Sequence, residues 1–301
     1  MNMRRFALAA AMAAGIGSAA HAQGFSDNSV SLTYGPDFKE PGVSTPADPK
    51  GVPISKEIIS VTHVDGWKYG SNFANIDALF SNNNDKANSI NGMTGNNSNA
   101  NAVEVYALYR GQLSPNAIFD TTITTIPHVT KEIDFEIGGD FNTKNTAFAP
   151  QKKLFVVGPN FHLDVPYFAF LNIGLHFSQE WNQNGIVGHA VNFSPAFEFE
   201  SAYLVPLDFV GIPLRFSGFA NFVEPKGKDG FGNSTKTEFL TQNNLILDLG
   251  GLAFDKPHFL DIYVGYQYWL NKFGNNSNSN ASDFTPGSLA STVYFGTSLH
   301  F

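Results

Sequence analysis

Carboxylate side chains recur at every second position in several segments of this chain. In the segment 131–141, the acids Glu132, Asp134, Glu136 and Asp140 alternate with apolar residues. Successive side chains of a β-strand point to opposite faces, so these four acids would share one face. Such a face can attract cations, accept hydrogen bonds from hydroxyl groups, or form ion pairs that stabilise the fold.

Local motifs of enzyme chemistry are absent from the sequence. There is no H-E-x-x-H, G-x-S-x-G or P-loop pattern, and the eight histidines are scattered. We therefore expect His63, His162 and His176 to be polar residues with hydrogen-bond partners. The chain has no cysteine, which excludes a disulfide framework and a thiolate metal site. We predict that the protein is not an enzyme and has no cofactor and no metal.

The N-terminal residues have the order of a secretory signal peptide. Two arginines precede an apolar stretch at 6–16, and small residues for cleavage follow at 20–22. The stretch is shorter than the roughly 20 residues that a membrane-spanning helix needs. We predict a signal peptide at 1–22 and a single domain at 23–301. That domain has 16 basic and 26 acidic side chains, which disfavours binding to a nucleic acid polymer.

The apolar residues of the mature chain are abundant but dispersed. The sequence contains 29 phenylalanines, and no later apolar run approaches 18 residues, which excludes a helical membrane protein. Alternation with a period of two is typical of a transmembrane barrel, whose apolar face meets lipid. We therefore predict an all-β fold, a transmembrane antiparallel β-barrel of about 12 strands. The predicted strands are 28–35, 56–65, 67–80, 102–113, 131–141, 152–164, 169–181, one around 197–200, 212–222, 237–249, 259–270 and 289–301.

Turn signals divide these strands. Asp65-Gly66 predicts a two-residue hairpin, and Gly158-Pro159 predicts a bulge within a strand. The connection at 114–130 has no clear assignment. If the N-terminus is periplasmic, the outward loops are long and the periplasmic turns short. The outward loops are then 36–55, 82–101, 142–151, 182–190, 223–236 and 271–288, and the loop at 82–101 holds nine asparagines.

The last strand resembles the terminal strand by which outer-membrane barrels are recognised. Val293, Phe295, Leu299 and the final residue Phe301 would share one face. We predict that this strand engages the barrel assembly machinery, and that the protein lies in the outer membrane of a Gram-negative bacterium, in contact with its lipid. Aromatic residues near strand ends also favour lipid; they include Trp67, Trp181 and Trp269. A soluble two-sheet sandwich shows the same alternation, but the signal peptide and the terminal phenylalanine favour the barrel.

The opposite, polar face of each strand would line the lumen. Arg110 and Arg215 are its clear cations, and acids are expected to outnumber bases severalfold, so the lumen would favour cations and neutral polar solutes over anions. Aromatic members could stack on flat solutes. Alternatively, the charges form ion-pair networks that only brace the barrel. The predicted lining residues are Glu104, Tyr106, Arg110, Asp134, Glu136, Asp140, His176, Glu180, Glu198, Glu200, Arg215, Phe219, Glu238, Asp248, Asp261, Tyr263 and Trp269.

Several segments resemble the Tsx-like nucleoside-specific channel family, and more closely its outer envelope protein branch. The resemblance implies a monomeric twelve-stranded barrel with a narrow channel for nucleosides, and surface loops that phages can exploit. It spans nearly all of the mature chain, but its motifs are structural and assign no substrate-binding residue. The segments are Ser31 to Pro36 with Phe38 to Pro41, Thr62 to Phe73, Glu104 to Tyr106 with Tyr109 and Arg110, and Gly139 to Asn145.

We therefore predict an outer-membrane channel for passive diffusion of small polar solutes, nucleosides above all, through a narrow acidic and aromatic lumen. One alternative is a plugged barrel whose loops bind a partner or a phage. A second is an outer-membrane hydrolase, because a catalytic site in a barrel wall needs no local sequence motif. A conducting pore would separate the channel from both.

Overall fold

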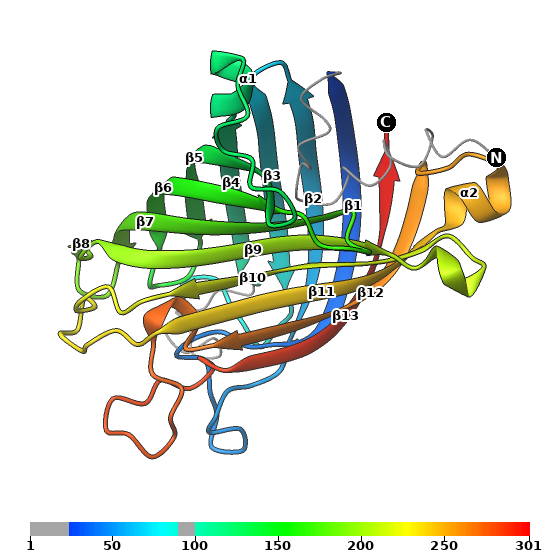
Figure 1. The fold of residues 1–301 in the computed structure, drawn as a ribbon. Coiled ribbons are helices and arrows are strands. Elements are labelled where there is room, and N and C mark those ends of the chain that lie inside the picture. Colours follow the sequence, from blue (N-terminus) through cyan, green and yellow to red (C-terminus); the bar gives the residue numbers. More distant parts are fainter. Residues whose placement is uncertain (1–23, 90–99) are drawn as a thin grey trace.

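The computed structural model describes residues 24–89 and 100–301, which form one antiparallel sheet closed into a barrel (Figure 1). No helix within these ranges is long and apolar enough to cross a membrane. The predicted signal peptide and residues 90–99 of the asparagine-rich loop lie outside the described residues. The strands are β1 (Phe25–Phe38), β2 (Ile54–Trp67), β3 (Gly70–Ser81), β4 (Val103–Leu113), β5 (Thr130–Lys144), β6 (Gln151–Leu163), β7 (Phe170–Asn184), β8 (His189–Asn192), β9 (Ala196–Pro206), β10 (Leu214–Val223), β11 (Glu238–Asp248), β12 (Leu260–Leu270) and β13 (Ala290–His300). The connections hold α1 (Pro115–Phe119), α2 (Leu249–Phe254) and two 3₁₀ turns, η4 (Asp208–Val210) and η5 (Lys272–Gly274).

The sheet closes because neighbouring strands pair around the whole circumference. β1 pairs with β13, and on the opposite side of the barrel β6 pairs with β7. β8 and β9 are two pieces of one wall strand, since β7 pairs with β8 through 181–184 and with β9 through 170–178. The described residues thus form twelve wall strands, which confirms the predicted fold.

Side chains of the wall alternate between an apolar outer face and a polar inner face. In β5, Phe135 and Phe141 point outward and are 47% and 58% exposed, whereas the inward Glu136 is 2% exposed. In β13 the outward Phe295 is 50% exposed. A barrel with this outer surface and a polar interior has the pattern of one that faces lipid. The alternation also explains why nearly all buried charge lies in the lumen.

The two ends of the barrel differ in the length of their connections. The hairpin between β2 and β3, both α-helices and the C-terminus lie at one end, which we call the turn end (Figure 1). The longer segments 39–53 and 271–289 lie at the other, the loop end. The connection at 114–129, unassigned from the sequence, belongs to the turn end. Its Ser114 caps α1 by accepting the backbone N–H of Ala117 at 2.9 Å.

The predicted turn at Asp65-Gly66 is wrong. Both residues continue β2, and the hairpin reverses three residues later, where Trp67 still pairs with Gly70. The ring of Trp67 packs edge-on against Tyr69 with centroids 5.6 Å apart, which stabilises the later turn.

The predicted bulge at Gly158-Pro159 is also wrong. Both residues keep a continuous register with β5. Pairing with β7 stops at Val157 and resumes at Asn160 without a shift. Pro159 has no backbone N–H to donate, which accounts for a gap in the pairing rather than an inserted residue.

Candidate functional site: the barrel lumen

All seventeen predicted lining residues occupy inward positions, but they do not form one site. Each shares its face with inward residues of the neighbouring strands, as His176 of β7 does with Glu198 of β9. Residues of the β4–β9 wall meet in the middle of the lumen, and others contribute to its two ends. The middle group, called the central network, consists of Tyr106, Arg110, Glu136, Asp140, Lys152, His176, Glu198 and Glu200.

Arg110 connects two separated parts of the wall. From β4 its Nη1 donates to Asp140 Oδ1 on β5 at 2.7 Å, and its Nη2 and Nε donate to Glu200 on β9 at 2.6 and 3.2 Å. Because β5, β6 and β7 lie between β4 and β9 in the sheet, the guanidinium spans part of the lumen. A fork of two parallel hydrogen bonds to one carboxylate is among the strongest charged contacts in proteins. The passage is therefore narrowed at Arg110.

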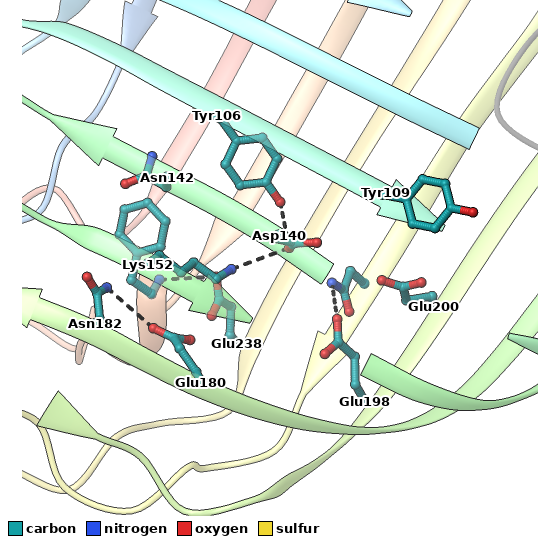
Figure 2. A network of polar contacts seen from close by, with 12 residues as sticks. Tyr106, Tyr109, Asp140, Asn142, Lys152, Glu180, Asn182, Glu198, Glu200 and Glu238 are labelled. Carbon is teal, nitrogen blue, oxygen red and sulfur yellow. Dashed lines mark hydrogen bonds and ion pairs between the residues drawn. The ribbon is translucent and has the colours of Figure 1, made fainter. Parts of the chain in front are cut away.

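Other polar groups surround Asp140. The hydroxyl group of Tyr106 donates to it at 2.7 Å, and Lys152 Nζ lies 3.5 Å away (Figure 2). Glu198 lies beside Glu200 on β9, and Asn221 donates to one of its oxygens at 2.7 Å. The other oxygen of Glu198 is buried without a hydrogen-bond partner.

His176 has no hydrogen-bond partner either, which makes the expectation from the sequence wrong. Its side chain is fully buried, with Nε2 3.5 Å from Glu136 and Nδ1 3.6 Å from Glu200. His162 does have hydrogen-bond partners, as expected. They are Asn172 at 2.9 Å and Asp134 at 3.1 Å. The half-buried His63 contacts two polar side chains, Asn28 and Asp65, on the outer face. His176 thus differs from the other two histidines.

Glycines make room for the central network. A Cβ atom at Gly174 would collide with the ring of His176, and one at Gly138 would lie 2.6 Å from Cδ of Arg110. Both glycines face inward, where a larger side chain would displace the imidazole or the guanidinium.

A second charged group, which we call the mouth cluster, lies at the loop end. Glu40, just after β1, contacts Lys56 of β2 at 2.5 Å, Lys272 of η5 at 3.0 Å and Lys144 of β5 at 3.2 Å. Asp85 lies 2.7 Å from Lys144, and Glu104 lies 3.4 Å from Lys56. Because β5, β2 and η5 span about half the circumference, Glu40 ties segment 39–53 across the mouth.

The charges of the mouth cluster act on one another strongly. Burial alone would raise the pKa of Glu40, but Lys144, Lys272 and Lys56 outweigh burial and hold this pKa well below its usual range. Burial, helped by the two other lysines, lowers the pKa of Lys272 despite its contact with Glu40. Segment 39–53 is further held by backbone bonds from Gly42 to Pro286 and from Gly287 to Lys50, each 2.8 Å.

Most of the remaining predicted residues have local partners. Arg215 pairs with Asp261 and lies 2.8 Å from His258 at the turn end. Asp248 caps α2 by accepting from Gly251 at 2.8 Å. Glu180 pairs with Lys226. These contacts fit the bracing role that the sequence left open.

The wall of β10–β13 is different in character. It carries the inward aromatic residues Phe219, Tyr263, Trp269 and Tyr294, and between them lie amides and hydroxyls such as Gln267. In the closed order of the described strands, β12 lies six pairing steps from β5, and β13 lies six from β6. The aromatic wall of β10–β13 therefore faces the wall of β4–β9, which we call the charged wall. Trp269 belongs to it: its Nε1 donates to the inward Glu238 at 2.7 Å, so its assignment to a lipid-facing belt is wrong, whereas Trp67 and Trp181 do point outward.

Acids still outnumber bases in the lumen, but the predicted severalfold excess is too large. Lysines, as well as Arg110 and Arg215, pair with carboxylates of the lumen. Lys56, Lys144 and Lys152 sit at alternating polar positions, where the pattern could have revealed them. Lys226 and Lys272 reach inward from loops, where no period applies. The additional cations are Lys56, Lys144, Lys152, Lys226 and Lys272.

Comparison with known proteins gives distant structural likenesses alone. No protein-family model matches the chain, and no curated protein matches it. Among solved structures, it is similar to the NanC porin with a TM-score of 0.48 and 11% identity, covering 90% of this chain and 98% of that one. It is similar to the KdgM porin, solved in complex with disordered oligogalacturonate, with a TM-score of 0.42 and 7% identity, covering 91% and 99%. The translocator domain of the autotransporter NalP from Neisseria meningitidis gives 0.41 and 10%, covering 99% and 94%. At these levels the likenesses carry no argument about function, and the resemblance to the Tsx-like family stays a prediction.

Proposed function

We propose that the protein is an outer-membrane channel through which small polar solutes, nucleosides in particular, diffuse passively. The observation that carries this proposal is the pairing of two unlike walls across one lumen. The aromatic wall of β10–β13 faces the charged wall of β4–β9, and Arg110 narrows the passage between them.

A nucleoside has surfaces that suit both walls. Its flat base can stack on aromatic side chains, with an energy of the order of 1 to 3 kcal/mol per base. Phe219 is the inward phenylalanine of the described β10–β13 wall, and its ring has no polar group that a hydrogen bond could hold, so it suits this role. The hydroxyl groups of the sugar can donate to carboxylates such as Glu200 and Glu238. Several weak contacts in series, rather than one tight site, allow rapid passage.

The charge of the central network favours neutral solutes and cations over anions. Its four carboxylates exceed its two fixed cations, Arg110 and Lys152, so a phosphate group would meet a repulsive field there. This selectivity separates nucleosides from nucleotides. The resemblance to the Tsx-like family supports the same class of solute.

The proposed location rests on the outer surface and on both ends of the chain. The apolar outer face suits lipid, the predicted signal peptide at 1–22 suits export, and the outward face of β13 with Phe301 after it suits recognition by the barrel assembly machinery. We place the turn end in the periplasm and the loop end outside the cell, where phages could reach the loops.

The test is single-channel conductance of the refolded protein in a planar bilayer, titrated with nucleosides. We expect saturable block by nucleosides, with no block by amino acids and much weaker block by nucleotides. Phe219→Ala should weaken nucleoside block about tenfold, in line with the loss of one stacking contact. Phe222→Ala is the matched control, because Phe222 lies on the same strand and points outward. Equal block in both variants, or conductance without any block, would contradict the nucleoside assignment.

The mouth cluster favours a second candidate, a plugged barrel whose loops bind a partner. Glu40 ties segment 39–53 across the loop end, and such a closure could be permanent. A refolded protein that inserts into bilayers but never conducts, even after substitution of Glu40, would favour this candidate.

A further inference from the structure

His176 is a buried polar group that the proposed channel does not use. Its imidazole is fully buried, and neither ring nitrogen has a hydrogen-bond partner. A buried donor or acceptor without a partner costs roughly 1 to 3 kcal/mol, so such groups need an explanation. Both nitrogens point at carboxylates, Nε2 at Glu136 and Nδ1 at Glu200.

The central network also has an excess of negative charge. Glu136, Asp140, Glu198 and Glu200 carry four negative charges when ionised, whereas Arg110 and Lys152 carry two positive ones. Glu198 lies directly opposite His176 in the register of β7 and β9, and one of its oxygens has no partner. Uncompensated charge is costly in a buried site. A divalent cation would balance the network.

The geometry of three donors fits a metal ion. One donor atom each from Glu136, His176 and Glu200 lies within 4.8 Å of the others. Tetrahedral coordination with bonds of about 2.1 Å places neighbouring ligand atoms about 3.4 Å apart. The distance from His176 Nε2 to Glu136 Oε1 is 3.5 Å, close to that spacing. The third donor, an oxygen of Glu200, lies within the same 4.8 Å of the other two.

The carboxylates are already oriented from behind. Gln112 and Asn160 donate to Glu136 Oε2 at 2.7 and 2.6 Å, which leaves Oε1 turned toward His176. Arg110 holds both oxygens of Glu200 by its two hydrogen bonds, and its Nε lies 3.6 Å from Glu136 Oε1. Metal ligands are typically held by such outer contacts.

We propose that Glu136, His176 and Glu200 bind one divalent transition-metal ion, of the class of Zn²⁺, in the middle of the lumen. One imidazole with two carboxylates suits Zn²⁺ better than Ca²⁺ or Mg²⁺, which prefer all-oxygen sites. The bound ion lies beside the Arg110 bridge, narrows the passage further and adds positive charge there.

The first experiment measures binding of Zn²⁺ alone to the refolded full barrel, by calorimetry and by elemental analysis after removal of metal with a chelator. We expect one Zn²⁺ per chain, not displaced by a large excess of Ca²⁺. His176→Gln should weaken binding at least tenfold. His162→Gln is the matched control, because His162 is an equally buried lumen histidine whose nitrogens have partners.

Glu136→Gln keeps the shape of the ligand and removes its charge, so it tests the site if His176→Gln fails to fold. In the planar bilayer, Zn²⁺ should reduce the conductance of the wild type and of His162→Gln, and leave that of His176→Gln unchanged. The proposal is overturned by an absence of saturable binding, by equal affinity in wild type and both site variants, or by Ca²⁺ binding as tightly as Zn²⁺. None of these outcomes bears on nucleoside block, which is measured without metal.

Discussion

The mouth cluster and the central network both place carboxylates among cations, but they are completed differently. At the mouth, Glu40, Asp85 and Glu104 meet three lysines, so the charges balance. In the central network the carboxylates exceed the fixed cations by two, and His176 and Glu198 keep unpartnered atoms, whereas at the mouth one oxygen of Asp85 does. The mouth cluster joins strand ends to loops, whereas the central network stands on strands alone.

This difference indicates two roles: the mouth cluster holds a segment of the chain, and the central network can bind a solute or an ion. A balanced cluster with every charge in contact has little to gain from a solute, and its role is to hold segment 39–53 in place. An unbalanced network with unpartnered atoms gains from a cation or from hydrogen-bond donors that come from outside. The two regions therefore predict opposite responses to substitution: loss of Glu40 should release a closure, and loss of Arg110 should weaken the barrel itself.

Arg110→Ala is expected to have the largest effect on stability. It leaves Asp140 and Glu200 without their main partner in a buried site, and breaking such a pair typically costs about 3–5 kcal/mol. The free energy of unfolding, measured by urea titration in lipid vesicles, should fall by that order. Cation preference in a salt gradient should rise at the same time, because the negative excess grows by one.

Arg215→Ala is the control for that measurement. Its partner Asp261 keeps a second contact, with His300 at 3.3 Å, so a smaller loss of stability is expected. Equal losses in the two variants would contradict a special role for the central network.

Glu40→Gln is expected to open the mouth. The amide leaves three lysines with the two carboxylates of Asp85 and Glu104, so segment 39–53 loses its side-chain anchor and keeps only its backbone bonds. Single-channel conductance should rise at least twofold, and the ion preference should shift toward anions, because the mouth then has an excess of one positive charge. Glu57→Gln is the control, since Glu57 is exposed on the outer face of β2. An unchanged conductance would mean that Glu40 does not close the pore.

The same two regions show what the sequence could and could not predict. A period of two places every inward residue, which is why all seventeen lining residues lie on the correct face. It does not state which strands meet across the lumen, so the contact of Arg110 with Glu200, 90 positions away, needed the closed barrel. Glu40 and Lys272 come from loops, whose paths follow no period, so of the mouth cluster only Glu104 was predicted from the sequence.

Acidification is expected to have the smallest effect within the physiological range, and the comparison of the wild type with Glu40→Gln isolates the mouth. The lysines hold the folded-state pKa of Glu40 well below the ordinary value of 4.5. Because the folded pKa is lower than the unfolded one, the ionised carboxylate stabilises the closure above pH 4.5, and this is lost only as the pH falls through the folded pKa. Conductance of the wild type should therefore stay constant from pH 7 to about pH 5 and rise only in stronger acid, whereas Glu40→Gln should show no such transition. A rise between pH 6 and pH 5 that Glu40→Gln does not share would mean that Glu40 is not surrounded by three charged lysines, and the contrast between a balanced mouth and an unbalanced centre would fail.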